Sequence, residues 1–312
     1  MASTLFEAVF DNPLTSGLNL IREGEPVSTV SVDGRTALKS ELSRSDDSVR
    51  SEVVPAGMDD SAFTAAGSQT ANAKLGHTYE YEAKILIPEG WQEDSTPEIL
   101  MQWHDFPDSG EAWKNPAAAL QIRPWSDGES HFVLETHADA SRITPSGGSG
   151  RYDSKETFDL GKVEDAVGEW TDWKFKIKWG YTDDSGSMEV WRDGKRLVNE
   201  DMATAFNDEH GPYWKLGVYK WAWSDGRDTG ADSRTYYYDD IRIKADGEDR
   251  SADAPAEALP PSAAETDTLN FDAFTDGGTD GGTDGMTDGG DAVPLAGVPP
   301  VLPIDQQAMM LA

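Results

Sequence analysis

The feature that most constrains this chain is a two-residue alternation of apolar and polar side chains in short segments. In residues 79–87 and 173–179, aromatic and aliphatic residues occupy every second position, with mostly Glu and Lys between them. Because successive side chains of a strand point to opposite faces, this pattern is typical of strands with one buried face. Asp193-Gly194, between residues 188–192 and 195–198, is a hairpin-turn signal. Few segments have a helical period, and we expect one short helix, over residues 200–208.

Residues 1–246 have room for about ten to fifteen short antiparallel strands, which predicts a single all-β domain, a sandwich or a jelly roll. The 11 Trp residues of the chain argue against disorder in this part. The absence of Cys excludes a disulfide framework, a Cys-zinc site and a cysteine nucleophile. No apolar run approaches the roughly 20 residues of a membrane-spanning helix.

Charge separates a second region, residues 247–312. The chain has a formal net charge of -32, of which -12 falls in this region, and residues 275–290 repeat the tetrapeptide Thr-Asp-Gly-Gly. Such a repeat cannot build a core, so we predict a disordered, acidic and flexible C-terminal tail. A calcium-binding repeat is the alternative, although the nonapeptide of β-roll proteins is absent. The acidic excess predicts that the chain binds neither nucleic acid nor anionic membranes.

Two predicted strands each place a chemically useful pair on one face. In residues 48–54, Arg50 and Glu52 share a side, as a surface ion pair on an edge strand would. In residues 98–104, Gln102 and His104 share a side with Leu100, whereas Ile99, Met101 and Trp103 point the other way. The Gln102–His104 pair is either a buried hydrogen-bonded pair or a proton-transfer group with a polar neighbour.

A third predicted strand, residues 213–221, is the most informative. Trp214, Leu216 and Val218 form an apolar face suited to the core. The opposite face carries Tyr213, Lys215, Gly217, Tyr219 and Trp221. Aromatic rings stack on sugars, lysine attracts a carboxylate, and glycine lets a ligand approach the backbone. This face therefore predicts a carbohydrate-binding platform.

Together the three strands resemble the jelly-roll polysaccharide lyases over residues 5–246. Alginate lyases of family 7 carry R-[ST]-E-[LV], Q-[IV]-H and Y-F-K-x-G-x-Y strands. The counterparts here are Arg50-Ser51-Glu52-Val53, Gln102-Trp103-His104 and residues 213–219. The QWH tripeptide and the continuation GVYKW are more similar to the glucuronan lyase (polysaccharide lyase family 20) and heparin lyase I branch. The resemblance implies a concanavalin-like β-jelly roll of two curved antiparallel sheets.

The resemblance also implies a reaction, the β-elimination of a uronic-acid polymer. The uronate carboxylate must be neutralised, a base must remove the C5 proton, and an acid must protonate the departing O4. By position, Tyr219 is the acid, and also the base if nearby cations lower its pKa from about 10. His104 is the alternative base or a partner of the carboxylate, and Gln102 and Arg50 are the neutralisers. Lys215, Tyr213, Trp221, Glu52 and Arg123 are expected to bind substrate, with Lys215 also able to tune the tyrosine.

Stereochemistry connects the base to the substrate. In β-linked glucuronate H5 and O4 lie on the same side of the ring, so one tyrosine suffices. In iduronate or guluronate they lie on opposite sides, and His104 and Tyr219 would divide the work. Our first expectation is an endo-acting lyase of β-1,4-glucuronan, with alginate or a heparin-type glycan as alternatives.

Members of this branch often hold calcium, so the resemblance implies a structural Ca²⁺ ion and no organic cofactor. Asp208, Glu156 and Asp240 are the candidate oxygen ligands. The alternative for Asp240 is that Asp239-Asp240 simply begins the last strand.

Two rival functions remain. A carbohydrate-binding module of the same shape needs the aromatic face but not the other site residues. A glycoside hydrolase needs a close carboxylate pair, commonly an E-x-D-x-x-E strand, which the sequence lacks.

The substrate and the composition also give expectations for the whole protein. We expect a monomer that is secreted without an N-terminal signal peptide, because the polymer is extracellular and residues 1–12 lack a basic and apolar leader. A polyanionic substrate on an acidic protein further predicts a locally basic face, made by Arg50, Lys215, Lys220 and Arg123.

Overall fold

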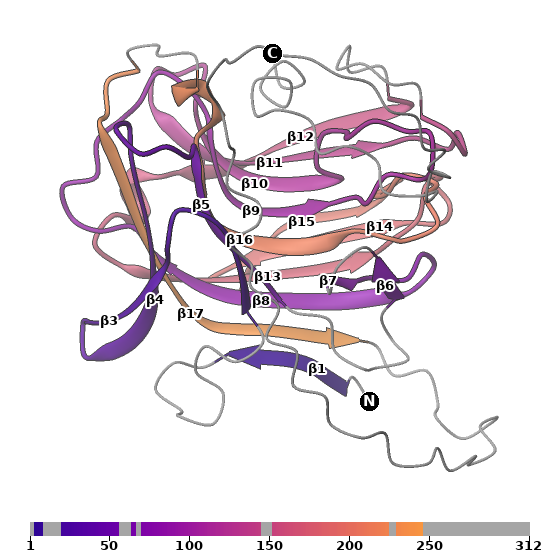
Figure 1. The fold of residues 1–312 in the computed structure, drawn as a ribbon, viewed down its shortest axis with the longest axis horizontal. Helices are drawn as coiled ribbons and strands as arrows, with labels where there is room; N and C mark the ends of the chain where they lie inside the picture. Colours follow the sequence, from indigo (N-terminus) through magenta and orange to yellow (C-terminus); the bar gives the residue numbers. More distant parts are fainter. Residues whose placement is uncertain are drawn as a thin grey trace, which may run out of the picture. The chain divides into compact units, whose positions relative to one another are not determined.

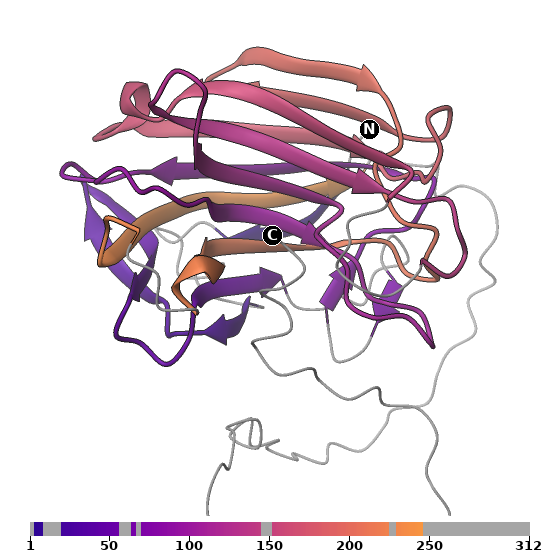
Figure 2. The same ribbon diagram turned by 90° about the horizontal axis from the view of Figure 1, so that it is seen from above.

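The alternating segments form two antiparallel sheets that pack against each other (Figures 1 and 2). The computed structural model describes residues 3–8, 20–55, 64–66, 70–144, 152–224 and 229–245. These residues belong to one compact unit of the chain. The predicted tail, residues 247–312, lies outside the described residues. The same holds for the repeat in residues 275–290, for which calcium binding was the alternative.

The first sheet contains, in order, β15 (Lys195–Asp201), β14 (Ser187–Arg192), β13 (Trp170–Lys178), β8 (Thr78–Leu86), β17 (Ser233–Ala245), β4 (Arg35–Ser43) and β3 (Ser28–Val32), and β1 (Ser3–Ala8) pairs with β17. The second contains β12 (Ser154–Lys162), β11 (Ser130–Ala138), β10 (Ala118–Pro124), β9 (Glu98–His104), β16 (Tyr213–Tyr219), β5 (Arg50–Pro55) and β2 (Leu20–Gly24), and β7 (Thr70–Asn72) pairs with β16 and with β6 (Thr64–Ala66). The expectation of an all-β jelly roll with two antiparallel sheets is confirmed.

Aromatic side chains join the two sheets. Trp103 and Trp214 face each other across the β9–β16 pair, with stacked rings whose centroids are 5.9 Å apart. Tyr81 of the first sheet contacts both, at 5.4 and 5.3 Å. The burial of each such side chain stabilises the fold by about 1.5–3 kcal/mol, and the edge-to-face contacts add about 0.5–1.5 kcal/mol. This core lies directly beneath the strands that carry the three sequence motifs.

The predicted hairpin is present. β14 and β15 are joined by Asp193 and Gly194, whose φ angles are 51° and 75°. Positive φ at both turn residues produces the twist that a two-residue hairpin needs.

The predicted helix over residues 200–208 is wrong. β15 continues to Asp201, and Phe206 forms a β-bridge with Asp139. The Thr204 hydroxyl donates to the Lys178 carbonyl at 2.7 Å, and the Ala205 amide donates to the Gly180 carbonyl at 3.1 Å. The segment thus forms its hydrogen bonds with other segments of the same chain and not within itself, as a helix would. In the described part of the chain the helical pieces are two 3₁₀ turns, η1 (Glu164–Ala166) and η2 (Trp221–Trp223), and no helix there has the length and apolarity to cross a membrane.

Candidate active site

The three sequence motifs lie on adjacent strands, in the order β9, β16, β5. Their register places Arg50 opposite Tyr219, Gln102 opposite Lys215 and His104 opposite Tyr213, with the Glu52–Gly217 pair between the first two rows. Trp214, Leu216 and Val218 of β16 belong to the main core. The alternate residues of β16 therefore lie on the sheet face turned away from that core, which we call the site face.

A bulge changes the predicted faces of β9. The register with both neighbouring strands shifts at Leu100, between Ile99 and Met101. Leu100 and Met101 both enter the main core, whereas Ile99 joins a smaller cluster with Ala119, Tyr219 and Trp221. The prediction that Ile99 shares a face with Met101 and Trp103 is therefore wrong. Gln102 and His104, beyond the bulge, keep their common face.

Arg50 and Tyr219 are in direct contact. The guanidinium carbon of Arg50 lies 4.2 Å from the centre of the Tyr219 ring. Burial raises the pKa of Tyr219 above its usual value, although Arg50 and, more weakly, Lys215 act to lower it. A role for Tyr219 as base would require nearby cations to lower this pKa, but burial outweighs them here. A phenol with a raised pKa remains protonated at neutral pH and suits the role of acid.

Glu52 ties the neutralising side chains together. Its Oε1 accepts a hydrogen bond of 2.6 Å from Gln102 Nε2, and its Oε2 lies 3.4 Å from Arg50 NH1. Glu52 is fully buried, and β5 lies between β2 and β16. The interpretation of Arg50 and Glu52 as a surface ion pair on an edge strand is thus wrong. Glu52 holds two site residues in place, which differs from the substrate-binding role that we expected.

Gly217 is required by the neighbouring strand. It lies opposite Glu52 with φ of 137°, and a Cβ atom there would approach the Ser51 carbonyl oxygen to 2.1 Å. From the sequence we expected this glycine to let a ligand approach the backbone. The structure gives a different reason, the close passage of β5.

Lys215 and Tyr213 complete β16 on the site face. Lys215 Nζ lies 5.2 Å from the centre of the Tyr213 ring, and both residues are buried, as are Gln102 and Tyr219. The side chains predicted to form a carbohydrate-binding platform on β16 are therefore buried in this structure.

His104, at the end of β9, is held by the next residue. Its Nδ1 lies 3.0 Å from the Asp105 carbonyl oxygen and 3.1 Å from Asp105 Oδ1. Trp113 packs edge-on against the ring at 5.3 Å. Sequence reasoning missed Asp105, although its position directly after a candidate histidine was a usable signal.

A cluster of buried charges lies behind Asp105. Lys114 Nζ is 3.2 Å from Asp105 Oδ2, 2.7 Å from Glu111 Oε2 and 3.0 Å from Asp208 Oδ1. Burial and the neighbouring Asp105 carboxylate raise the pKa of Asp208 to about 8. No sequence motif indicated this cluster, because Asp208, in the segment between β15 and β16, is distant in sequence from the β9–β10 loop that carries the other three residues.

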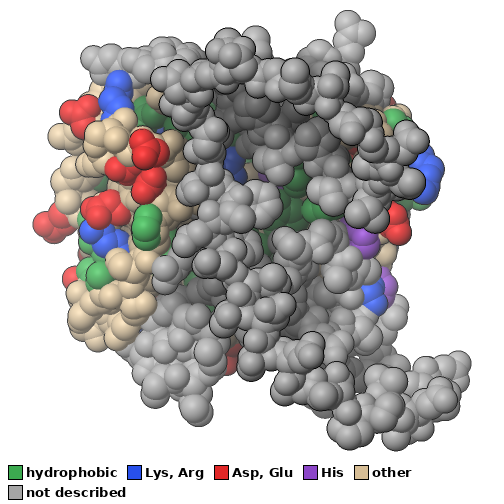
Figure 3. All heavy atoms as spheres, in the orientation of Figure 1, with side chains coloured by type: hydrophobic (Ala, Val, Ile, Leu, Met, Phe, Trp, Pro, Cys, Tyr) green, Lys and Arg blue, Asp and Glu red, His purple; other side chains and the backbone are tan. Residues whose placement is uncertain are grey.

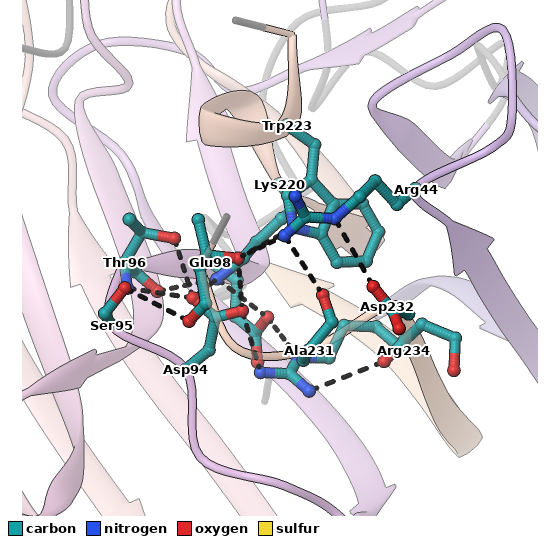
Figure 4. Close-up of polar contacts among 12 residues, drawn as sticks. Arg44, Asp94, Ser95, Thr96, Glu98, Lys220, Trp223, Ala231, Asp232 and Arg234 are labelled. Atoms are coloured by element: carbon teal, nitrogen blue, oxygen red, sulfur yellow. Dashed lines mark hydrogen bonds and ion pairs between the residues drawn. The ribbon is translucent and has the colours of Figure 1, made fainter. Parts of the chain in front are cut away.

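Trp221 and Lys220 follow the end of β16. Trp221 lies in η2 and packs on Tyr219, with ring centroids 5.6 Å apart, so it borders the site from a turn and not from the strand. Lys220 is fully buried, with its ammonium 2.9 Å from Asp94 and 3.4 Å from Glu98 (Figure 4). Glu98 also binds Arg234 Nε at 2.5 Å. The prediction that Lys220 makes the site face basic is wrong, because two acidic residues bind its charge inside the protein.

The guanidinium of Arg123 is also bound by neighbouring side chains. Its NH2 donates to Gln121 at 2.9 Å and lies 3.3 Å from Glu135, which in turn contacts Lys155 at 3.2 Å. The positive charge near Tyr219 comes mainly from Arg50 and Lys215. Elsewhere, exposed Asp and Glu side chains lie on the described surface beside Lys and Arg (Figure 3).

The predicted calcium ligands do not form a common site. Asp208 faces Lys114, and Asp240 lies in the other sheet, with its carboxylate 2.7 Å from Lys84 and 3.2 Å from Arg242. Glu156 is exposed on β12, beside Asp153 and Asp183 in a hollow of about 720 Å³. Two of the three carboxylates already have ammonium or guanidinium partners, so the set does not fit one calcium ion. Among the described residues, no group of three or more His, Asp or Glu side chains is placed to hold a metal.

The sequence profile of the polysaccharide lyase family matches residues 23–242. The chain belongs to this family. The match includes all three motif strands, and it supports the expectation of a lyase over that of a hydrolase or a simple binding module. No protein of curated function matches the chain in sequence.

Among solved structures, the fold is similar to an endo-β-1,4-glucuronan lyase from the fungus Trichoderma reesei, with a TM-score of 0.57 and 19% identity over 77% of this chain and 95% of that one. An alginate lyase from a Chlorella virus matches with a TM-score of 0.46 and 10% identity, over 78% of this chain and 100% of that one. The binding domain of botulinum neurotoxin serotype C1 matches with a TM-score of 0.47 and 12% identity, over 77% of this chain and 48% of that one. At 19% identity, the likeness to the fungal glucuronan lyase concerns the fold alone.

Proposed function

We propose that this polysaccharide lyase cleaves β-1,4-glucuronan, acting within the chain and leaving 4,5-unsaturated uronate ends. The observation that carries the proposal is the contact between Arg50 and Tyr219, with Lys215 on the same face of β16 beyond Gly217. It places a proton-carrying phenol beside cations that can neutralise a uronate carboxylate. The similarity to the fungal glucuronan lyase is the reason for naming glucuronan first.

In this proposal Arg50 and Gln102, both bound to Glu52, neutralise the carboxylate and make the C5 proton more acidic. Tyr219 accepts that proton as phenolate and returns it to O4 on the same side of the sugar. His104 is separated from Tyr219 by the Gln102–Lys215 row, and it holds the substrate from there. Because burial raises the pKa of Tyr219, kcat/KM should increase as the pH rises above neutral.

A second candidate, a lyase of guluronate or iduronate polymers, is favoured by a different observation. Asp105 engages Nδ1 of His104. The neutral ring would then accept a proton at Nε2, as a base separate from the acid Tyr219. This division suits sugars in which H5 and O4 lie on opposite sides.

The test is a panel of glucuronan, polymannuronate, polyguluronate and heparin, assayed both for ultraviolet absorbance of unsaturated ends and for new reducing ends. We expect absorbance with glucuronan, increasing toward alkaline pH, and its loss in soluble, folded Tyr219→Phe. Activity only on polyguluronate or heparin would favour the second candidate. A fully active Tyr219→Phe protein, or reducing ends without absorbance, would overturn the proposal.

A further inference from the structure

The ring of His104 is fixed on three sides. Nδ1 contacts the carbonyl and the carboxylate of Asp105 at 3.0 and 3.1 Å. Trp113 packs edge-on at 5.3 Å, and the Tyr213 ring lies 6.1 Å away at a tilt of 32°. Within the described structure, Nδ1 is the ring nitrogen that binds protein, so Nε2 is available for a ligand.

Asp105 is a buried carboxylate that retains its charge. It is 1% exposed. Burial acts to raise its pKa, but the contacts with His104 and Lys114 lower the pKa overall. An ionised group beside an imidazole stabilises the protonated form of the ring.

Lys114 anchors this carboxylate. Its ammonium joins Asp105 to Glu111 and Asp208, and its side chain is 5% exposed. A buried charge cluster of this kind contributes little net stability compared with well-packed apolar residues. The cluster contacts His104 through Asp105, so it can fix the position of a candidate site residue.

We propose that Asp105, held by Lys114, is a positioning residue for His104, which it orients with Nε2 toward the substrate and whose charged form it stabilises. The inference rests on the proposed function in one respect, that His104 meets the substrate. The charged and titratable groups around His104 are Asp105 and Tyr213, with Lys114, Glu111 and Asp208 behind Asp105.

The test follows the ring nitrogens of His104 by nitrogen NMR across a pH series, in the parent protein and in Asp105→Asn. In the parent, the neutral ring should carry its proton on Nδ1. In Asp105→Asn, the ring should be less easily protonated than in the parent, because the neighbouring negative charge is lost. The kcat/KM should fall about tenfold or more, with partial recovery in Asp105→Glu.

Asp159→Asn is the matched control, because Asp159 Oδ1 lies 2.7 Å from Nδ1 of His131 on the neighbouring strands β11 and β12. It should change the titration of His131 and leave His104 and kcat/KM unchanged. Protonation of Nε2 in the neutral parent ring overturns the inference even if no variant folds, and so does an unchanged His104 titration in Asp105→Asn. The NMR measurement does not depend on catalytic activity. If the protein has no lyase activity, the proposed function is refuted, but the NMR result still tests the role of Asp105.

Discussion

Glu52 Oε1 accepts the amide of Gln102 at 2.6 Å, and this single contact joins two sequence motifs across the strand that lies between them. The other oxygen of Glu52 faces Arg50 at 3.4 Å. The two groups proposed to neutralise the substrate thus share one buried carboxylate, so their positions depend on each other.

Glu52→Gln should reduce activity more than its position behind the site suggests. The amide keeps the size of Glu52 but loses the charge that orients Arg50 and Gln102, at a cost of about 1–3 kcal/mol in unfolding free energy. We expect a fall in kcat/KM on the uronan together with a small loss in urea stability. Glu189→Gln, which removes a partly exposed partner of Arg196, is the control and should change neither. Parent-like activity in Glu52→Gln would show that Arg50 and Gln102 need no common anchor.

Gly217→Ala should severely destabilise the sheet. The new Cβ would lie 2.1 Å from the Ser51 carbonyl oxygen, so β5 and β16 must separate, at a cost of about 3 kcal/mol or more. Gly34→Ala provides a matched comparison, because Gly34 also has positive φ, 74°. A Cβ atom added there would meet nothing within 4 Å apart from its own chain neighbours. That variant should lose about 1–2 kcal/mol, from backbone strain alone. Equal losses in urea unfolding would contradict the role assigned to the passage of β5.

Lys220→Met should cost about 3–5 kcal/mol of unfolding free energy, because Asp94 and Glu98 would lose a buried partner. The same substitution at Lys176, whose ammonium is partly exposed and 4.0 Å from Glu189, should cost less than about 1 kcal/mol. Denaturant titrations of both variants at the same pH give the comparison. If the two losses match, the network in Figure 4 contributes no more than a surface pair.

Asp208 should make the stability of the protein fall as the pH rises from about 4 to 8. Its pKa is about 8 in the folded protein and about 3.9 in an unfolded chain. Between these values the folded state holds one more proton, and rising pH therefore favours unfolding. Asp208→Asn should remove this contribution, so its unfolding free energy should rise relative to the parent between about pH 5 and pH 8.5. Asp232→Asn, at a side chain that is 97% exposed, is the control. A constant difference between parent and Asp208→Asn across this range would exclude the raised pKa.

The sequence by itself determined the strands and the faces that carry chemistry. The alternation in residues 79–87 and 213–219 predicts one apolar and one polar side per strand, because strand geometry alone imposes a two-residue period. The grouping of Arg50, Gln102 and Tyr219 into one site required the resemblance to the polysaccharide lyases, because the alternation within a strand does not relate separate strands. Even Asp193-Gly194 could be assigned to its hairpin, since a two-residue turn is a local structure.

The tertiary structure alone decided which side chains meet and which charges are available. Lys220, directly after β16, was expected to make the site face basic, yet it is buried against Asp94 and Glu98. Leu100 leaves its predicted face because two neighbouring strands set the register of β9 and introduce a bulge. The Lys114 cluster and the raised pKa of Tyr219 likewise depend on burial among residues distant in sequence. Local patterns cannot encode such effects, because electrostatic energies depend on the distances and the solvent exposure that folding creates.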